Sequence, residues 1–440
     1  MKKIVCFISL GFISLLSIKS KAQAVNDTIQ TNASLQQCIQ YAIVHQPLVQ
    51  QALIDQQIVE TEIKSKLADW YPQLSLGLNY QNNFRPPVAD FGGSIVNTTT
   101  YNTSNAGLQL TQNIFDRDVL LASHTAKDIR TQVRQFTEVD KIVLAVSVTQ
   151  AFYAVLLNEK QIDLTTEDIK RLQRSLKDAY SQYQAGLVDK IDYKRATISL
   201  NNSLSQKKGQ EDSLKAKYSV LKLAMGYPDS SSLQLEFDSV KLQNEIYIDT
   251  TQGVNYDNRV EYRLFQTQRR LLEQNVRYNK LSYFPTISAY GAYNANFFNN
   301  SFSKLYSQNY PTSWAGIQLS LPIFQGFKRT ENIKGAELLY KQSEYSLIGI
   351  KDTINTQYEQ ALATYKSNLY NYGIFDENLK LATEVYNTLE VQYKAGIKTY
   401  LDVITAEDDL RAAEIAYTNA LYQILISKVT VQKALGIVQY

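Results

Sequence analysis

The chain states one sequence plan twice, and this duplication constrains its fold more than any other feature. Three pairs of segments recur in the same order: KLADWYPQLSLGLNY (66–80) with KLSYFPTISAYGAYN (280–294), AGLQLTQNIF (106–115) with AGIQLSLPIF (315–324), and YQAGLVDKIDY (183–193) with YKAGIKTYLDV (393–403). Such repetition is typical of a duplicated structural unit. We therefore expect two similar halves that pack around a pseudo-two-fold or barrel axis.

Four short segments alternate apolar and polar residues, as strands with one apolar face do. Leu74, Leu76 and Leu78, for example, alternate with Ser75 and Gly77. The pattern predicts strands at about 73–84, 106–115, 286–298 and 315–324. Each has roughly 10 residues, the length that a tilted strand needs to cross a bilayer. The polar segments between paired strands, 85–105 and 299–314, are predicted to be solvent loops.

Large aromatic residues stand where these strands are predicted to start: Trp70, Tyr71, Phe284 and Trp314. Aromatic side chains gather in this way at membrane–water interfaces, so the four are candidates for an interfacial belt. Alternation alone leaves an alternative open, namely surface hairpins on a soluble protein.

The remainder of the chain predicts unusually long helices. Residues 88–227 and 323–440 contain no proline, so neither stretch holds a helix breaker of that kind. Tyrosine or leucine recurs every seven residues from Tyr358 to Tyr393, which indicates coiled-coil packing. A helix over 326–394 would be on the order of 100 Å long.

The third repeated pair marks the far ends of these helices. Gly186 and Gly396 each follow one long helical segment and precede another, so each is predicted to cap a hairpin tip farthest from the strands. Four strands are too few to close a barrel, and an open sheet edge cannot face lipid. Two chains would give a narrow barrel of eight strands and three would give twelve, which can hold a pore. We expect three.

The N-terminal segment MKKIVCFISLGFISLLSIKSKAQA is typical of a secretory signal peptide. No later stretch approaches the ~20 apolar residues of a spanning helix. The expected organisation is therefore a signal peptide (1–24), a first repeat (25–225, with strand hairpin 73–115 and a tip near 186), an equatorial linker (226–256) and a second repeat (257–440, with strand hairpin 286–324 and a tip near 396).

Charge and chemistry exclude several classes of function. The formal net charge is +3 with no basic stripe, which argues against nucleic acid as a partner. The two histidines, His45 and His124, have neither metal-ligand nor triad spacing, and no glycine-rich phosphate loop follows a strand. The sequence predicts no enzyme, no metal site and no cofactor.

Motifs and their order resemble the TolC family of bacterial outer-membrane efflux proteins over essentially the whole mature chain. The resemblance is carried by SLQQCIQYAIVHQPLV, by WYPQLSL and YFPTISA, by LPIFQGFKR, and by the two tip phrases with ALG near the end. It implies a homotrimer in outer-membrane lipid: a twelve-stranded transmembrane β-barrel, four strands per chain, continued by a periplasmic α-helical barrel. It also implies docking with a periplasmic adaptor protein and an inner-membrane pump of the RND or ABC type.

The second tip matches the family pattern best. Tyr393, Gly396 and Asp402 fit it, and Lys398 stands where the family often has a basic residue. The resemblance places Asp402 in an acidic ring at the periplasmic mouth, while Thr405 departs from a second acidic position. Asp192 is the repeat equivalent of Asp402.

From these positions we form the hypothesis that Asp192, Lys398 and Tyr393 make a gate latch that an adaptor releases. Simple solvated charges near a turn are the alternative. Leu187 and Ile397, beside Gly186 and Gly396, are candidates for adaptor contact, with burial inside the hairpin as the alternative.

Together these features predict a passive exit duct of a tripartite efflux or type I secretion system, gated at its periplasmic tip. A coiled-coil rod without a pore, exported to the periplasm or cell surface, is the rival. Export of small molecules and secretion of polypeptides are not distinguished by the residues.

Overall fold

The computed structural model describes residues 32–186, 189–236 and 239–440, so the predicted signal peptide and Leu187 lie outside the described residues. The strands are β1 (Gln73–Asn82), β2 (Val88–Phe91), β3 (Ser94–Asn97), β4 (Asn102–Phe115), β5 (Thr286–Asn299) and β6 (Tyr310–Ser320). The α-helices are α1 (Leu35–His45), α2 (Pro47–Ala68), α3 (Arg117–Gln184), α4 (Lys190–Met225), α5 (Ser239–Asn244), α6 (Val260–Lys280), α7 (Lys328–Lys394) and α8 (Tyr400–Leu435). Short 3₁₀ turns are η1 (Tyr256–Asn258), η2 (Leu281–Tyr283) and η3 (Phe302–Ser307).

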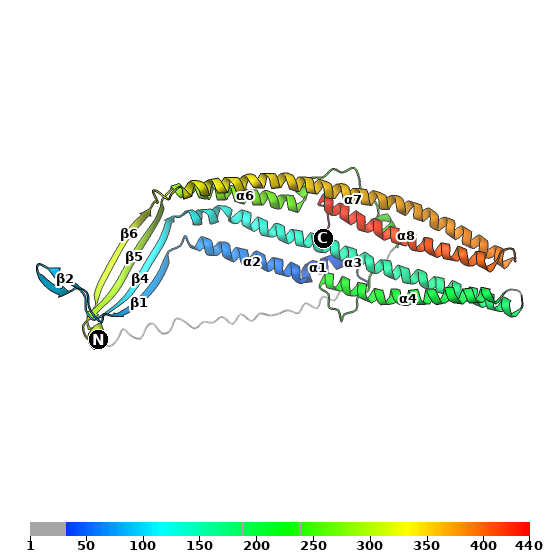
Figure 1. Ribbon diagram of the computed structural model, residues 1–440, viewed down its shortest axis with the longest axis horizontal. Coiled ribbons are helices and arrows are strands. Elements are labelled where there is room, and N and C mark those ends of the chain that lie inside the picture. Colours follow the sequence, from blue (N-terminus) through cyan, green and yellow to red (C-terminus); the bar gives the residue numbers. More distant parts are fainter. Residues whose placement is uncertain (1–31, 187–188, 237–238) are drawn as a thin grey trace.

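The molecule is elongated, with the main sheet at one end and two helical tips at the other (Figure 1). The sheet is antiparallel in the order β1-β4-β5-β6. Within the described chain, β1 and β6 are its edges, and each leaves one side without a partner strand. An edge of this kind is a template for another strand.

One face of the sheet is apolar across all four strands. The register sets Leu76 of β1 opposite Leu108 of β4, Leu108 opposite Tyr293 of β5, and Ala289 of β5 opposite Ile317 of β6. Leu78 remains 75% exposed, and the other β1 leucines are exposed as well. Because side chains alternate between faces, the polar residues of the same strands lie on the other face.

The long helices have the predicted extent. α3 has 68 residues and α7 has 67, so each is about 100 Å long. Along α7 the predicted seam is the inward side: Ile354, Tyr358, Ala361 and Tyr365 are buried, and the rest of the seam is partly buried. The heptad interpretation is confirmed.

The helices follow the same order as the strands. α3 packs against both α2 and α6, and α6 packs against α7, just as β4 lies between β1 and β5. Farther from the sheet, α4 pairs with α3 and α8 pairs with α7, which gives two long hairpins (Figure 1). The main hydrophobic core lies at mid-length, where α1, α3, α4, α7 and α8 meet the linker between the halves.

The linker is held to the second hairpin by tyrosine hydroxyls. Tyr365 donates to the carbonyl of Ile246 (3.0 Å) and accepts from the N–H of Ile248 (3.2 Å), while Tyr358 donates to the carbonyl of Gln252 (2.7 Å). The seam tyrosines of α7 therefore also hold the linker against the middle of the molecule.

One expectation about apolar stretches needs correction. α3 contains an 18-residue window with a mean hydropathy of 1.5, apolar enough by composition to cross a membrane. However, 56% of that window is buried inside the structure. Val148, Phe152 and Val155 belong to the central core, so the apolar composition is explained by helix packing.

Two loop predictions were also too simple. Segment 85–105 contains the β2–β3 hairpin, and β4 begins at Asn102, before the predicted start. The hairpin forms because Gly92 and Gly93 both adopt positive φ, 64° and 90°, as a tight two-residue turn requires. At 310, β6 begins earlier than predicted although Pro311 is its second residue, which is tolerated because β6 is an edge strand.

Candidate functional site

Both predicted tip glycines are confirmed as helix caps. Gly186 and Gly396 each have φ of 75°, and nothing within 4 Å would meet a Cβ at either position. At the second tip, the N–H of Gly396 donates to Tyr393 (2.9 Å) and the N–H of Ile397 donates to Gln392 (2.9 Å). This pattern ends α7 and reverses the chain into α8.

Asp402 lies in the first turn of α8 and caps that helix. Its Oδ2 accepts from the N–H (2.9 Å) and the hydroxyl (2.7 Å) of Thr399, and its own N–H donates to Thr399 Oγ1 (3.3 Å). The Thr399 hydrogen bonds, with a smaller contribution from nearby Lys398, hold the pKa of Asp402 below its usual range. The carboxylate is therefore ionised at neutral pH and fixed in place beside the tip.

The other latch residues are not joined within one chain. Tyr393 donates its hydroxyl to Gln182 Oε1 of α3 (3.2 Å). Across the described ranges, Asp192 makes no hydrogen bond or ion pair with Lys398 or Tyr393, although burial first, and then the nearby charges of Asp178 and Asp192, raise the pKa of Tyr393. A latch through Asp192 would thus have to form between copies.

The tip also exposes apolar side chains. Ile397 is 72% exposed, which excludes its burial inside the hairpin. Sequence analysis missed three further exposed apolar residues near the tips: Ile191, Val391 and Leu401. Their signal was their position within a few residues of Gly186 or Gly396, a region in which only the residue next to each glycine was considered.

The aromatic residues form belts at both ends of the sheet. Trp70, Tyr71 and Phe284 lie exposed at the junction between helices and strands, as expected. Trp314 is also exposed, but it does not lie at this junction. It lies within β6, opposite Ala292, on the polar face of the sheet. Its predicted place at a strand start was wrong because β6 begins at Tyr310. Aromatic residues that sequence analysis missed are Phe324 and Phe327 at the junction, and Phe298, Phe302, Tyr306 and Tyr310 at the opposite end.

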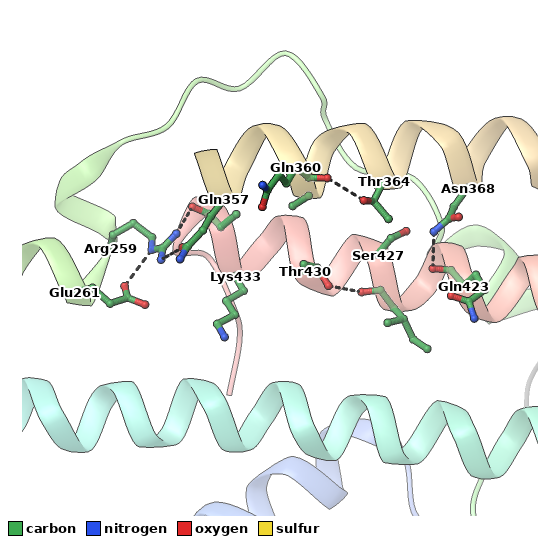
Figure 2. Close-up of a pocket in the computed structure, with 13 residues that line it drawn as sticks. Arg259, Glu261, Gln357, Gln360, Thr364, Asn368, Gln423, Ser427, Thr430 and Lys433 are labelled. Carbon is green, nitrogen blue, oxygen red and sulfur yellow. Dashed lines mark hydrogen bonds and ion pairs between the residues drawn. The ribbon is translucent and has the colours of Figure 1, made fainter. Parts of the chain in front are cut away.

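A polar groove runs between α7 and α8 at mid-length, with a volume of about 430 Å³ (Figure 2). Arg259 closes one end and is held by Glu261 (3.0 Å), Gln357 (2.9 Å) and the carbonyl of Ala434 (2.9 Å). Amides and hydroxyls line much of the remainder (Gln360, Thr364, Asn368, Gln423, Ser427 and Thr430), together with Lys433 and the apolar residues Ala361, Ile426 and Ala434. Lys428 of α8 donates instead to the linker carbonyl of Glu245, so the linker and the groove lie on different sides of the pair.

In the part of the chain that the structure covers, no group of three or more His, Cys, Asp or Glu side chains is placed to hold a metal ion. The site is instead a set of surfaces: an apolar sheet face, aromatic belts, a polar groove and two capped tips.

Comparison with known proteins gives the family. The family model described as outer membrane efflux protein matches residues 38–227 and 258–437, in two segments that follow the internal repeat. Outer membrane protein TolC of Escherichia coli (strain K12) is 23% identical over 445 residues, covering 96% of this chain and 85% of TolC. The alkaline protease secretion protein AprF of Pseudomonas aeruginosa is 22% identical over 287 residues, covering 64% of this chain and 59% of AprF.

Solved structures with a similar fold are also outer-membrane channels. The structure of the open state of the Neisseria gonorrhoeae MtrE outer membrane channel aligns with a TM-score of 0.75 at 16% identity, covering 91% of this chain and 88% of MtrE. These matches confirm the resemblance, the combination of strand sheet and long helical hairpins, and the outer-membrane channel interpretation over the rod. With the family model matched over most of its length, this chain belongs to the outer membrane efflux protein family.

Proposed function

We propose that three copies of this chain form a passive exit duct from the periplasm through the outer membrane, gated at the helical tips. The observation that carries the proposal is the pair of open edges on a sheet with a continuous apolar face. In lipid, the backbone groups of β1 and β6 need partners, and copies of the same chain supply them when β6 of one pairs with β1 of the next.

The helical layer supports the same closure. Near the sheet, the helices lie in the order α2, α3, α6, α7. The two outer helices, α2 and α7, therefore have one helical neighbour each. Both expose apolar side chains there, among them Ile54 and Ile58 on α2 and Leu338, Leu339 and Ile348 on α7. Contact between α7 of one copy and α2 of the next would bury these residues and continue the barrel into the periplasm.

A duct for water-soluble cargo needs a polar wall. The polar face of the sheet and the groove between α7 and α8 (Figure 2) both carry amide and hydroxyl groups. In this proposal both face the lumen, while the linker, held on another side of the α7–α8 pair, lies outside.

At the tip, three copies of Asp402 would ring the mouth. Each carboxylate is ionised and held by Thr399, so the ring would attract cations. In this proposal Asp192, Lys398 and Tyr393 form the latch between neighbouring copies, and exposed pairs of this kind contribute only about 0–1 kcal/mol each, which suits a reversible gate.

A periplasmic adaptor would dock on the exposed apolar residues beside the tip glycines, of which Ile397 is the most prominent. An inner-membrane pump, of the RND or the ABC type, would supply energy and select the cargo. The duct itself carries out no catalysis in this proposal. Because AprF is a secretion protein by name, small-molecule efflux and polypeptide secretion are both compatible roles.

Cross-linking between edge strands tests the assembly. In a Cys38→Ala background, Ser75→Cys on β1 would be combined in turn with Thr312→Cys or Gln318→Cys on β6, and each single variant would serve as a control. We expect one register to give a ladder that ends at three chains, from protein that conducts ions in planar bilayers. Protein that is soluble without detergent, forms no ladder and does not conduct would support the rod instead.

A further inference from the structure

A cluster of charged side chains with two buried carboxylates at its centre lies where the first hairpin meets α8. Its members are Asp168 and Arg171 of α3 and Glu407, Asp408, Arg411 and Glu414 of α8, with Ser203 of α4 beside them. Glu407 is two turns from the start of α8 at Tyr400, so the cluster lies close to the tip. Sequence analysis missed it, because its two halves are more than 200 residues apart.

Asp168 is the well-partnered carboxylate of the cluster. Its side chain is 1% exposed, and Oδ2 accepts from the Ser203 hydroxyl (2.8 Å) and from Arg411 Nη1 (3.4 Å). Arg171 Nη2 lies 3.6 Å from Oδ1. Two cations and a hydroxyl compensate for its burial, as a buried charge requires.

Glu407 is equally buried but poorly partnered. Its side chain is 2% exposed, and neither oxygen accepts a hydrogen bond. The nearest donor, Arg171 Nε, is 3.5 Å away and itself lacks a hydrogen-bond partner, while Arg171 Nη2 points toward Glu414 (3.4 Å). A buried carboxylate without donors favours its neutral form.

The groups around Glu407 reinforce this preference. Burial first, and then the negative charge of Asp168, raise the pKa of Glu407 to about 7, against the opposing effect of Arg171 and Arg411. On α7, burial and then Glu407 raise the pKa of Tyr386 to about 12. The charged and titratable groups facing Glu407 are thus Asp168 and Arg171 from α3, Tyr386 from α7, and Tyr400, Asp408 and Arg411 from α8, with the Ser203 hydroxyl the contribution of α4 to the described cluster.

We propose that Glu407 is a proton-binding site that couples the packing of the two hairpins to the pH of the periplasm. Protonated Glu407 holds α8 against α3 as in this structure, whereas ionised Glu407 favours separation of the hairpins near the tip. This inference rests on the proposed gating at the tip only for its effect on conduction. The packing change itself would occur in a chain that forms no channel.

The direction of the pH effect on hairpin packing follows from the linkage between packing and proton binding. The packed state binds the proton more tightly than a separated state in which Glu407 is solvated, so packing is fully favoured below the ordinary pKa of 4.5. The advantage is lost as pH rises toward about 7 and stays lost above it. The ratio of separated to packed hairpins should rise by up to about tenfold per pH unit within this window. Asp402 does not titrate there, because its pKa is lowered.

The test measures the distance between hairpins directly. Nitroxide labels would be placed at the exposed positions Ser181→Cys on α3 and Thr405→Cys on α8 in a Cys38→Ala background, with excess unlabelled chain so that distances within one chain dominate. Wild type, Glu407→Gln and the control Glu390→Gln would be compared at pH 5.5 and 7.5. Glu390 is a partly exposed residue of α7 that pairs with Lys394 within its own helix.

We expect a longer and broader distance at pH 7.5 in wild type and Glu390→Gln, and the same short distance at both pH values in Glu407→Gln. Circular dichroism should show that Glu407→Gln raises the melting temperature more at pH 7.5 than at pH 5.5, because wild type loses further stability between these two pH values. An identical pH response in wild type and Glu407→Gln would overturn the proposal, as would no response in wild type.

Conductance of the same three proteins separates this inference from the proposed function. A pH-dependent distance in protein that never conducts would contradict the duct and support the proton site. Protein that conducts ions, but whose hairpin distance and conductance do not change with pH, would support the duct and contradict the proton site.

Discussion

Two glycines at helix ends give a quantitative test of how tightly the end of α8 packs against the start of α6. Gly436 and Gly396 both cap a helix with positive φ, 73° and 75°. Their surroundings differ: nothing lies within 4 Å of a Cβ at Gly396, whereas a Cβ at Gly436 would lie 2.6 Å from the carbonyl oxygen and 2.8 Å from the carbonyl carbon of Asn258.

Relief of this clash is difficult, because the neighbouring backbone is anchored. Arg259 follows Asn258 and is 3% exposed, and its guanidinium donates to Ala434 in α8, two residues before Gly436. Alanine in the left-handed conformation costs about 1 kcal/mol. Overpacking against fixed backbone adds about 1–3 kcal/mol. We therefore expect Gly396→Ala to lose about 1 kcal/mol and Gly436→Ala about 2–4 kcal/mol.

Urea unfolding in detergent, followed by circular dichroism of the helices, measures the difference between these two variants. Gly186→Ala is a second control, since its surroundings are as open as those of Gly396. The expected order of stability is wild type, then the two tip variants together, then Gly436→Ala. Equal losses at 396 and 436 would refute the argument, because they would show that backbone strain alone decides and that the α8–α6 junction yields freely.

Two further predictions concern the linker and the mouth. Tyr365→Phe removes the hydroxyl that donates to the Ile246 carbonyl and accepts from the Ile248 N–H, so it should lose on the order of 1–3 kcal/mol and speed hydrogen exchange at Ile246–Ile248. Unchanged exchange would show that the hydroxyl is dispensable. Asp402→Asn should abolish block of the channel by divalent cations added on the tip side. Thr399→Ala removes the cap but keeps the carboxylate, so this variant should retain most of the block. Loss of block in both variants would mean that helix capping, and not the charge, is responsible.

Periodic features of the sequence predicted the architecture well. The seven-residue repeat from Tyr358 to Tyr393 found the seam of α7, and the glycines of the doubled phrase found both tips. These signals are local, because a few consecutive residues are enough to identify a helix face or a cap. Strand limits were less accurate, since Asn102–Asn105 are polar and join β4 through pairing with β1, which no local pattern reveals.

The candidate site was predicted only in part, for a related reason. Within one chain Tyr393 bonds Gln182, and the latch with Asp192 stays a prediction for contacts between copies, because helix rotation and assembly decide which side chain faces which neighbour. Trp314 was predicted at a strand start but lies within β6, because the polar residues before it join the strand through pairing with β5. The Glu407 cluster depends on partners from distant segments, and the family resemblance gave no pointer to it.

The open edges of β1 and β6 make assembly part of folding. A single chain in the bilayer would leave backbone groups of both strands in hydrocarbon, at a cost of several kcal/mol for each unsatisfied group. The stability of the sheet is therefore a property of the assembled copies and depends on their concentration. The helical hairpins, whose hydrogen bonds are internal, can form in one chain beforehand, so the barrel is expected to be the last part of the molecule to become ordered.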